Sequence, residues 1–190
     1  MGYGMVMPMA QDWTAERARA LPGDGQRYEV LDGVLAVTPA PGWKHQHVAF
    51  ALARRLDAHL RANGLGRAIM APADVEFSPT RLLEPDVFAI RDVRGRPPMN
   101  YREAGQLLLV AEVLSPTTAR HDRLTKRRIY MEEGVGEYWI VDADARTIER
   151  WRPGQDRPEM IDGVLRWEPA PNVPPLDLDV GAMFEEALGE

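Results

Sequence analysis

The chain has 190 residues and a mass of 21.3 kDa, and we expect residues 1–190 to form a single domain with a full-sized hydrophobic core. Hydrophobic residues make up 45% and charged residues 27% of the chain, which excludes a disordered or fibrous protein. The net charge of −6 argues against binding nucleic acid by bulk electrostatics alone, and the lack of cysteine excludes disulfides and thiolate metal sites.

The same features predict a cytoplasmic protein. The absence of cysteine fits a reducing compartment, and no apolar run approaches the length of a membrane span, so we expect no membrane association. Residues 1–11 are rich in Met and Gly and have no basic region before an apolar core. We therefore expect no signal peptide and a loosely held N-terminus.

The first third of the chain predicts a short helix, a β-hairpin and a long helix. Asp12 or Thr14 can cap the first helix, and Asp32-Gly33 between two β-prone runs is a strong hairpin signal. His45 lies at the end of the apolar stripe of the long helix, so it should point toward whatever that helix covers. The predicted ranges are 14–20 for the first helix, 27–31 and 34–38 for the hairpin, and 44–62 for the long helix.

The middle of the chain predicts strands, and the last third mixes helices with strands. Strands are expected over 66–72, 74–78 and 107–114, with a polar loop over 92–105. Within the segment 83–91, residues 87–90 are expected to form a strand that is entered through Glu84-Pro85-Asp86. Asp122 is expected to cap a helix over 123–133. Further strands are expected over 137–142 and 147–151, a hairpin over 157–161 and 164–167, and a helix over 179–188. This order predicts an α/β (α+β) fold, with a mixed β-sheet flanked by helices and extra β-hairpins.

Three side chains in this pattern suggest a site. Asp86 follows a proline at the start of a predicted strand, and Glu112 stands near the end of the apolar strand 107–114. If these strands are neighbours, both carboxylates reach one point, where their repulsion calls for a cation such as Mg²⁺ or Mn²⁺. Lys126, one turn into the next helix, could then orient water or hold a scissile phosphate.

At these residues the chain resembles a known family. Asp86, Glu112 and Lys126 resemble the PD-(D/E)XK nuclease pattern, with Leu114 at the usual lysine position and the lysine moved to the following helix. More closely, the chain resembles the Uma2 family, also called DUF820, of restriction-endonuclease-like proteins. The matching blocks are YEVLDGVLAV at 28–37, HQHVAFALARRL at 45–56, EPDVFAI at 84–90, AEVLSPTT at 111–118 and DRLTKRRIYMEEGVGEYWIVD at 122–142.

The resemblance implies a restriction-endonuclease-like core and a metal-dependent endonuclease that hydrolyses DNA. It implies metal ligands at Asp86, Glu112 and the Val113 carbonyl, and makes Lys126 the catalytic lysine. Glu29 and His45 match further site positions of the family. DNA is thus the expected partner, and a homodimer is a candidate assembly because a double-strand cut needs two sites.

Other interpretations of the same residues remain open. Asp86 can end a loop, Glu112 can belong to a structural ion pair with an arginine, and Lys126 can be a solvated residue paired with Asp122. Tyr130 and the tryptophans of the predicted strands are expected to pack in the core. At the level of function, the alternatives are a non-catalytic module that binds nucleic acid or protein, and a hydrolase of another phosphate ester.

Overall fold

The computed structural model describes residues 12–115 and 118–189, so the N-terminal segment 1–11, expected to be loosely held, lies outside the described residues. The described chain combines helices with multi-stranded sheets, as the sequence predicts. Within these ranges, no helix has both the length and the apolar character that crossing a membrane requires.

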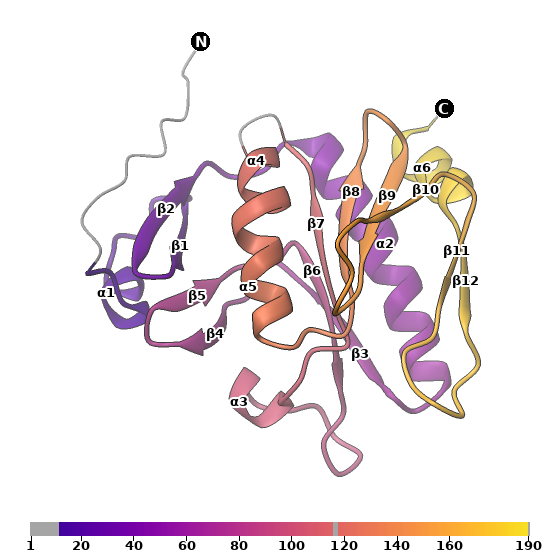
Figure 1. The fold of residues 1–190 in the computed structure, drawn as a ribbon, viewed down its shortest axis with the longest axis horizontal. Helices are drawn as coiled ribbons and strands as arrows, with labels where there is room; N and C mark the ends of the chain where they lie inside the picture. The colour runs from indigo at the N-terminus through magenta and orange to yellow at the C-terminus, as the bar shows by residue number, and fades with distance from the viewer. Residues whose placement is uncertain (1–11, 116–117, 190) are drawn as a thin grey trace.

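A six-stranded sheet lies at the centre of the molecule (Figure 1), in the order β10-β9-β8-β7-β6-β3. Its strands are β3 (Gly66–Met70), β6 (Val87–Arg91), β7 (Leu109–Val113), β8 (Tyr138–Asp142), β9 (Thr147–Trp151) and β10 (Glu159–Ile161). β7 and β8 pair in parallel, while the other neighbours pair antiparallel. The parallel pair requires a crossover connection, which the helical segment between the two strands provides.

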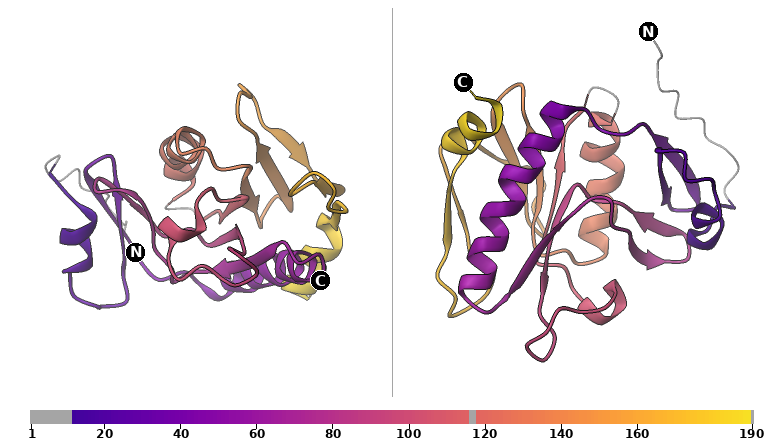
Figure 2. Two further views of the ribbon diagram at one scale, coloured as in Figure 1. Left: turned by 90° about the horizontal axis from the view of Figure 1, so that it is seen from below. Right: turned by 180° about the vertical axis from the view of Figure 1, so that it is seen from behind.

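Helices cover both faces of this sheet (Figure 2). α2 (Trp43–Ala62) lies on one face, and α4 (Ala119–His121), the π-helical turn η1 (Asp122–Lys126) and α5 (Arg127–Glu132) follow one another on the other. Alternate strand residues enter the two cores: Ala89 and Ala111 join the cluster of α2, whereas Phe88 and Val110 join that of α5. Because both faces are covered, the central strands are apolar on both sides.

A four-stranded sheet stands beside the central one and carries the N-terminal part of the chain (Figure 1). It has the order β2-β1-β5-β4, with β1 (Arg27–Leu31), β2 (Val34–Thr38), β4 (Val75–Ser78) and β5 (Arg81–Leu83). The predicted hairpin is confirmed, since Asp32 and Gly33 both have positive φ at the turn. α1 (Ala15–Arg19) precedes it, capped by the side chain of Thr14.

In the middle of the chain, one expectation is confirmed and another is wrong. The strand expected over 87–90 is present as β6, and Pro85, which lacks an N–H for a β-ladder, lies in the break that separates it from β5. β5 ends before this break in the small sheet, and β6 begins after it in the large one. The loop expected over 92–105 contains the short helix α3 (Tyr101–Ala104), whose N-cap Asn100 accepts a hydrogen bond from the Glu103 amide. Asn followed three residues later by Glu is a capping signal.

The hairpin expected around Asp162-Gly163 is also wrong, although strands stand on either side of it. β10 pairs with β9 in the large sheet, while β11 (Val164–Trp167) pairs with β12 (Leu176–Asp179) in a separate sheet. Ile161 and Leu165 still reach the same core cluster, so burial is satisfied without pairing the two strands to each other. The predicted terminal helix is present as α6 (Val180–Leu188), capped by Asp179.

Candidate functional site

The pairing of β6 with β7 brings Asp86 and Glu112 to the same end of the central sheet. Val87 pairs with Ala111 in an antiparallel register, so the residue before Val87 stands opposite the residue after Ala111. Glu112 points to the face covered by α5, because it shares the alternation of Val110. Asp86 directly precedes β6, and its carboxylate contacts the Val113 amide and His45. Asp86 is 3% exposed and Glu112 is 2% exposed, so both need partners.

Asp86 is held by three donors from three different elements. The Arg27 Nη1 group donates to Asp86 Oδ1 at 2.6 Å, and the Val113 amide donates to Oδ2 at 2.8 Å. The Nε2 atom of His45 lies 2.9 Å from the same Oδ2. Burial raises the pKa of Asp86, but the His45 hydrogen bond and the charges of Arg27 and Lys126 outweigh it and lower the pKa from 3.8 to about 2.

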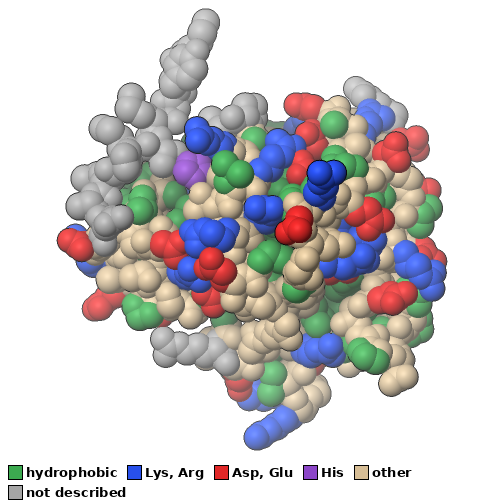
Figure 3. Space-filling view, in the orientation of Figure 1, with side chains coloured by type: hydrophobic (Ala, Val, Ile, Leu, Met, Phe, Trp, Pro, Cys, Tyr) green, Lys and Arg blue, Asp and Glu red, His purple; other side chains and the backbone are tan. Residues whose placement is uncertain are grey.

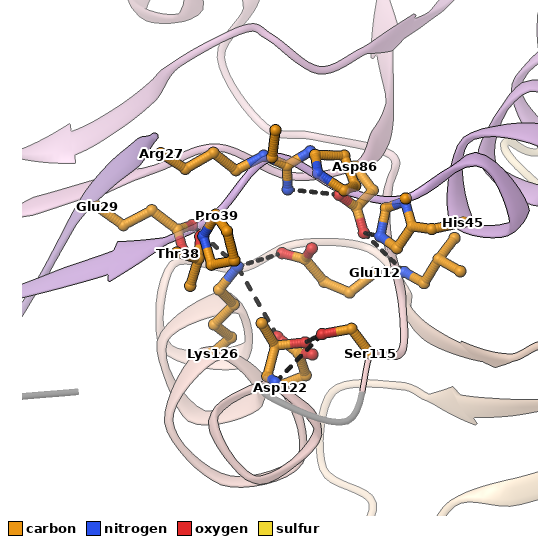
Figure 4. Close-up of a pocket in the computed structure, with 15 residues that line it drawn as sticks. Arg27, Glu29, Thr38, Pro39, His45, Asp86, Glu112, Ser115, Asp122 and Lys126 are labelled. Atoms are coloured by element: carbon orange, nitrogen blue, oxygen red, sulfur yellow. Dashed lines mark hydrogen bonds and ion pairs between the residues drawn. The ribbon is translucent and has the colours of Figure 1, made fainter. Parts of the chain in front are cut away.

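Glu112 is paired with a buried lysine rather than with an arginine (Figure 4). The Lys126 ammonium lies 3.0 Å from Glu112 Oε1 and 2.9 Å from Glu29 Oε1. Tyr130 donates its hydroxyl to the same Glu112 oxygen at 2.8 Å, so its ring packs in the core while its polar end reaches the site. Lys126 is only 4% exposed, and the interpretation as a solvated helix residue is therefore wrong.

Burial and neighbouring charges act in opposite directions on the pKa values of Glu112 and Lys126. Burial, together with the carboxylates of Asp86, Asp122 and Glu29, raises the pKa of Glu112 well above 4.5, although Lys126 opposes the rise. Burial would lower the pKa of Lys126, but the surrounding carboxylates outweigh it and raise the pKa, so this ammonium stays charged. In the protein without a cation, Glu112 thus retains a proton to a higher pH than an ordinary glutamate.

Asp122 does not cap a helix, contrary to expectation. The helical segment begins at Ala119, and Asp122 has helical φ and ψ of −63° and −46°. The π-helical turn η1 directs Asp122 and Lys126 inward together, and their Oδ1 and Nζ atoms lie 3.8 Å apart. Asp122 Oδ1 has no hydrogen-bond partner among the described residues. Burial raises the pKa of Asp122 from 3.8 to about 6, against the opposing effects of Lys126 and Thr118. Single-turn π segments often occur at functional sites.

All the predicted site residues line one cavity of about 210 Å³. These residues are Glu29, His45, Asp86, Glu112, Val113 and Lys126. The structure adds Arg27 and Asp122, both of which the sequence analysis missed as site residues. Two signals could have found them: Arg27 lies two residues before Glu29 on one strand face, and Asp122 continues the helical stripe of Lys126, Ile129 and Tyr130.

The donor set of the cavity fits a magnesium or manganese ion. Four lining carboxylates, Glu29, Asp86, Glu112 and Asp122, face two permanent cations, Arg27 and Lys126. If all four are ionised, two negative charges are in excess, which one divalent cation would balance. Within the described residues, no three His, Asp or Glu side chains form a ready cage for a metal. Mg²⁺ is commonly bound through one or two carboxylates and retains several waters, and Asp86 and Glu112 are the carboxylates that would hold it here.

The surface around the site does not form an unbroken basic patch. On the face that carries α5, Lys and Arg side chains alternate with Asp and Glu side chains (Figure 3). The ion pairs of Arg81 with Asp32, Glu132 and Glu133 belong to this mixed surface.

Comparisons with known proteins agree with this architecture. A crystal structure described as a putative nuclease belonging to DUF820 from Anabaena variabilis ATCC 29413 superposes with a TM-score of 0.75. The match covers 92% of this chain and 99% of that chain at 19% sequence identity, which shows the fold alone. No curated protein sequence matches the chain. The model of the family Uma2, described as "Putative restriction endonuclease", matches residues 15–180. Because this match extends over most of the sequence, the chain belongs to the Uma2 family.

Proposed function

We propose that this chain is a divalent-cation-dependent endonuclease that hydrolyses phosphodiester bonds of DNA. Asp86 and Glu112 would hold Mg²⁺ or Mn²⁺, with the Val113 carbonyl as a further ligand, and Lys126 would position water or stabilise the transition state. Nuclease chemistry is supported by the family description, "Putative restriction endonuclease", and by the description of the DUF820 structure as "a putative nuclease". We also propose that the protein is cytoplasmic, that it forms a homodimer and that residues 1–190 form a single domain.

The observation that carries the proposal is the placement of Lys126. The chain has two lysines, Lys44 and Lys126, and one of them is buried beside the two acids at the end of the central sheet. A buried ammonium is costly unless its charge is used or paired. In the proposed site, the helical segment would supply the ammonium that the PD-(D/E)XK pattern otherwise takes from the position of Leu114.

Each residue has a distinct part in the proposed reaction. A bound divalent cation lowers the pKa of water and stabilises charge on a phosphoryl oxygen. Asp86 stays ionised as a ligand because His45 and Arg27 hold its pKa at about 2. Lys126, fixed by Glu29 and Glu112, presents its ammonium to the cavity, where it can orient the attacking water or neutralise charge that develops on the phosphate.

The test is cleavage of DNA by the purified protein with Mg²⁺ or Mn²⁺. We expect Glu112→Gln and Lys126→Met to lose cleavage by at least about 100-fold. Lys44→Met is the matched control, because Lys44 lies outside the cavity and, among the described residues, forms an ion pair with Asp144 alone. This variant should cleave like the wild type. RNA and other phosphate esters would be assayed beside DNA, since the cation chemistry does not fix the substrate.

The second candidate function is a non-catalytic binding module on the same fold. Its supporting observation is that Lys126 already has close carboxylate partners, as in a structural ion-pair network. Failure of the wild-type protein to cleave any of these substrates with either cation would favour it over hydrolysis. Binding of Mn²⁺ that depends on Asp86 and Glu112 would instead favour the enzyme.

A further inference from the structure

Arg27 stands on the opposite side of the cavity from Lys126 (Figure 4). It opens β1, its side chain is 14% exposed, and it reaches the cavity from the four-stranded sheet. Arg27 contacts Asp86, whereas Lys126 contacts Glu112, so a cation lies beside each of the two proposed metal-binding carboxylates. A group bound between Asp86 and Glu112 would therefore meet positive charge from both sides.

The guanidinium of Arg27 retains donors that the protein does not use. Its Nε lies 2.9 Å from Glu84 Oε1, and its Nη1 lies 2.6 Å from Asp86 Oδ1. Among the described residues, no hydrogen bond involves its Nη2. A guanidinium has five N–H donors in a planar fork, which matches the oxygens of a phosphate. Arg27 thus has free donors on a side chain that lines the cavity.

Glu84 fixes this guanidinium from outside the cavity. Glu84 is not among the lining residues, and it holds the Nε edge while Nη1 and Nη2 remain on the other edge. The position of Arg27 therefore does not depend on Asp86 alone. It would persist if Asp86 turned one oxygen toward a cation, and Nη1 would then also be free for a ligand.

We infer that Arg27 forms an oxyanion site that binds a non-bridging oxygen of the substrate phosphate, opposite Lys126. The inference rests on the proposed function and adds a substrate-binding residue to it. The simpler role for Arg27 is to neutralise and hold Asp86. The two roles predict opposite effects on the cation. If Arg27 serves to hold Asp86 in place, it strengthens cation binding. If Arg27 serves to bind the phosphate, its positive charge beside Asp86 weakens cation binding or leaves it unchanged, because like charges repel.

The experiment measures two affinities in Arg27→Gln, Arg27→Lys and the wild type. Calorimetry gives the binding of inorganic phosphate to the Mn²⁺-loaded protein, and electron paramagnetic resonance gives the binding of Mn²⁺. We expect Arg27→Gln to bind phosphate about 10- to 100-fold more weakly, since it loses charge-assisted hydrogen bonds, and to bind Mn²⁺ as tightly as the wild type or more tightly. Arg27→Lys should fall between, because it keeps the charge but not the fork.

The matched control is Arg67→Gln, which also breaks a partly buried arginine–aspartate pair, with Asp92, but lies outside the cavity. It should leave both affinities unchanged. Unchanged phosphate binding in Arg27→Gln, a parallel loss of Mn²⁺ binding, or a wild type that binds no phosphate would each overturn the oxyanion site. If Arg27→Gln does not fold, Arg27→Lys replaces it in the test. Weaker phosphate binding with unchanged Mn²⁺ binding would support the oxyanion site, and a parallel loss of both would overturn it.

The outcomes for this site and for hydrolysis are separable. A wild type that binds phosphate through Arg27 but cleaves no substrate would retain the oxyanion site and refute the endonuclease. A protein that cleaves DNA equally well with Arg27 or Gln at this position would retain the endonuclease and refute the oxyanion site.

Discussion

Replacing Lys126 by methionine should destabilise the fold as well as stop cleavage. The ammonium lies 2.9, 3.0 and 3.8 Å from carboxylate oxygens of Glu29, Glu112 and Asp122. At an effective dielectric constant of about 20, each contact near 3 Å is worth about 5 kcal/mol before desolvation. Removing one partner from a buried pair typically costs about 3–5 kcal/mol, because the remaining charges lose their compensation. Methionine keeps a similar apolar stem, so little of the loss should come from packing.

The loss should depend on pH in a defined direction. In the wild type the folded-state pKa values of Glu112 and Asp122 already lie above 4.5 and 3.8, and without the ammonium they should rise further. A carboxyl group with a raised folded-state pKa favours folding below its unfolded pKa and loses that contribution as pH rises. The deficit of Lys126→Met should therefore be small near pH ~4 and reach its full size at neutral pH.

Urea denaturation of Lys126→Met and wild type across this pH range measures the effect. The free energy of unfolding follows from the midpoint and slope of each transition, and a loss of about 3–5 kcal/mol should lower the melting temperature by roughly 6–20 °C. Lys44→Met, with an exposed lysine, should show neither change. Equal stability of Lys126→Met and wild type at neutral pH, or a deficit that is the same at every pH, would refute the reasoning about the buried carboxylates.

Three further predictions address the acids and the packing of the sheet. Asp122→Asn should raise the free energy of unfolding at neutral pH by up to ~3 kcal/mol and leave it unchanged near pH ~4, because the pKa of Asp122 is raised from 3.8 to about 6. A urea titration in which the variant is less stable than the wild type at neutral pH would contradict this. Mn²⁺ binding should release protons and weaken as pH falls, because the pKa of Glu112 is raised; calorimetric heats that do not vary with the ionisation enthalpy of the buffer would speak against it. Gly66→Ala should lower the free energy of unfolding by about 1–3 kcal/mol, because the added Cβ would lie 1.9 Å from the Ile90 carbonyl oxygen. In thermal melts the control Gly163→Ala, whose Cβ would have no atom within 4 Å, should match the wild type. A Gly66→Ala variant as stable as the wild type would contradict the close approach.

Local signals in the sequence predicted most of the elements and the residues that surround the cavity. The Asp32-Gly33 hairpin follows from turn chemistry, and Glu112 was identified because an acid in an apolar strand needs a partner. The errors occurred where tertiary pairing decides. Asp162-Gly163 carries a hairpin signal, yet its flanking strands find other partners. Asp122 has a good capping side chain, but the helix begins earlier and the π turn directs that side chain inward. The only sequence signal for Arg27 is its position two residues before Glu29 on the same strand face, because its partners Glu84 and Asp86 are distant along the chain.

The side chains that line the cavity come from positions as far apart as Arg27 and Lys126, and from the four-stranded and the six-stranded sheet. Contacts between residues so distant in sequence require the loops between them to close, which costs conformational entropy. A nascent chain that has not yet reached Lys126 carries the proposed metal-binding carboxylates but lacks their ammonium. An N-terminal fragment that ends before Lys126 therefore cannot contain a complete site. The proposed hydrolysis requires a chain that includes the helical crossover between β7 and β8.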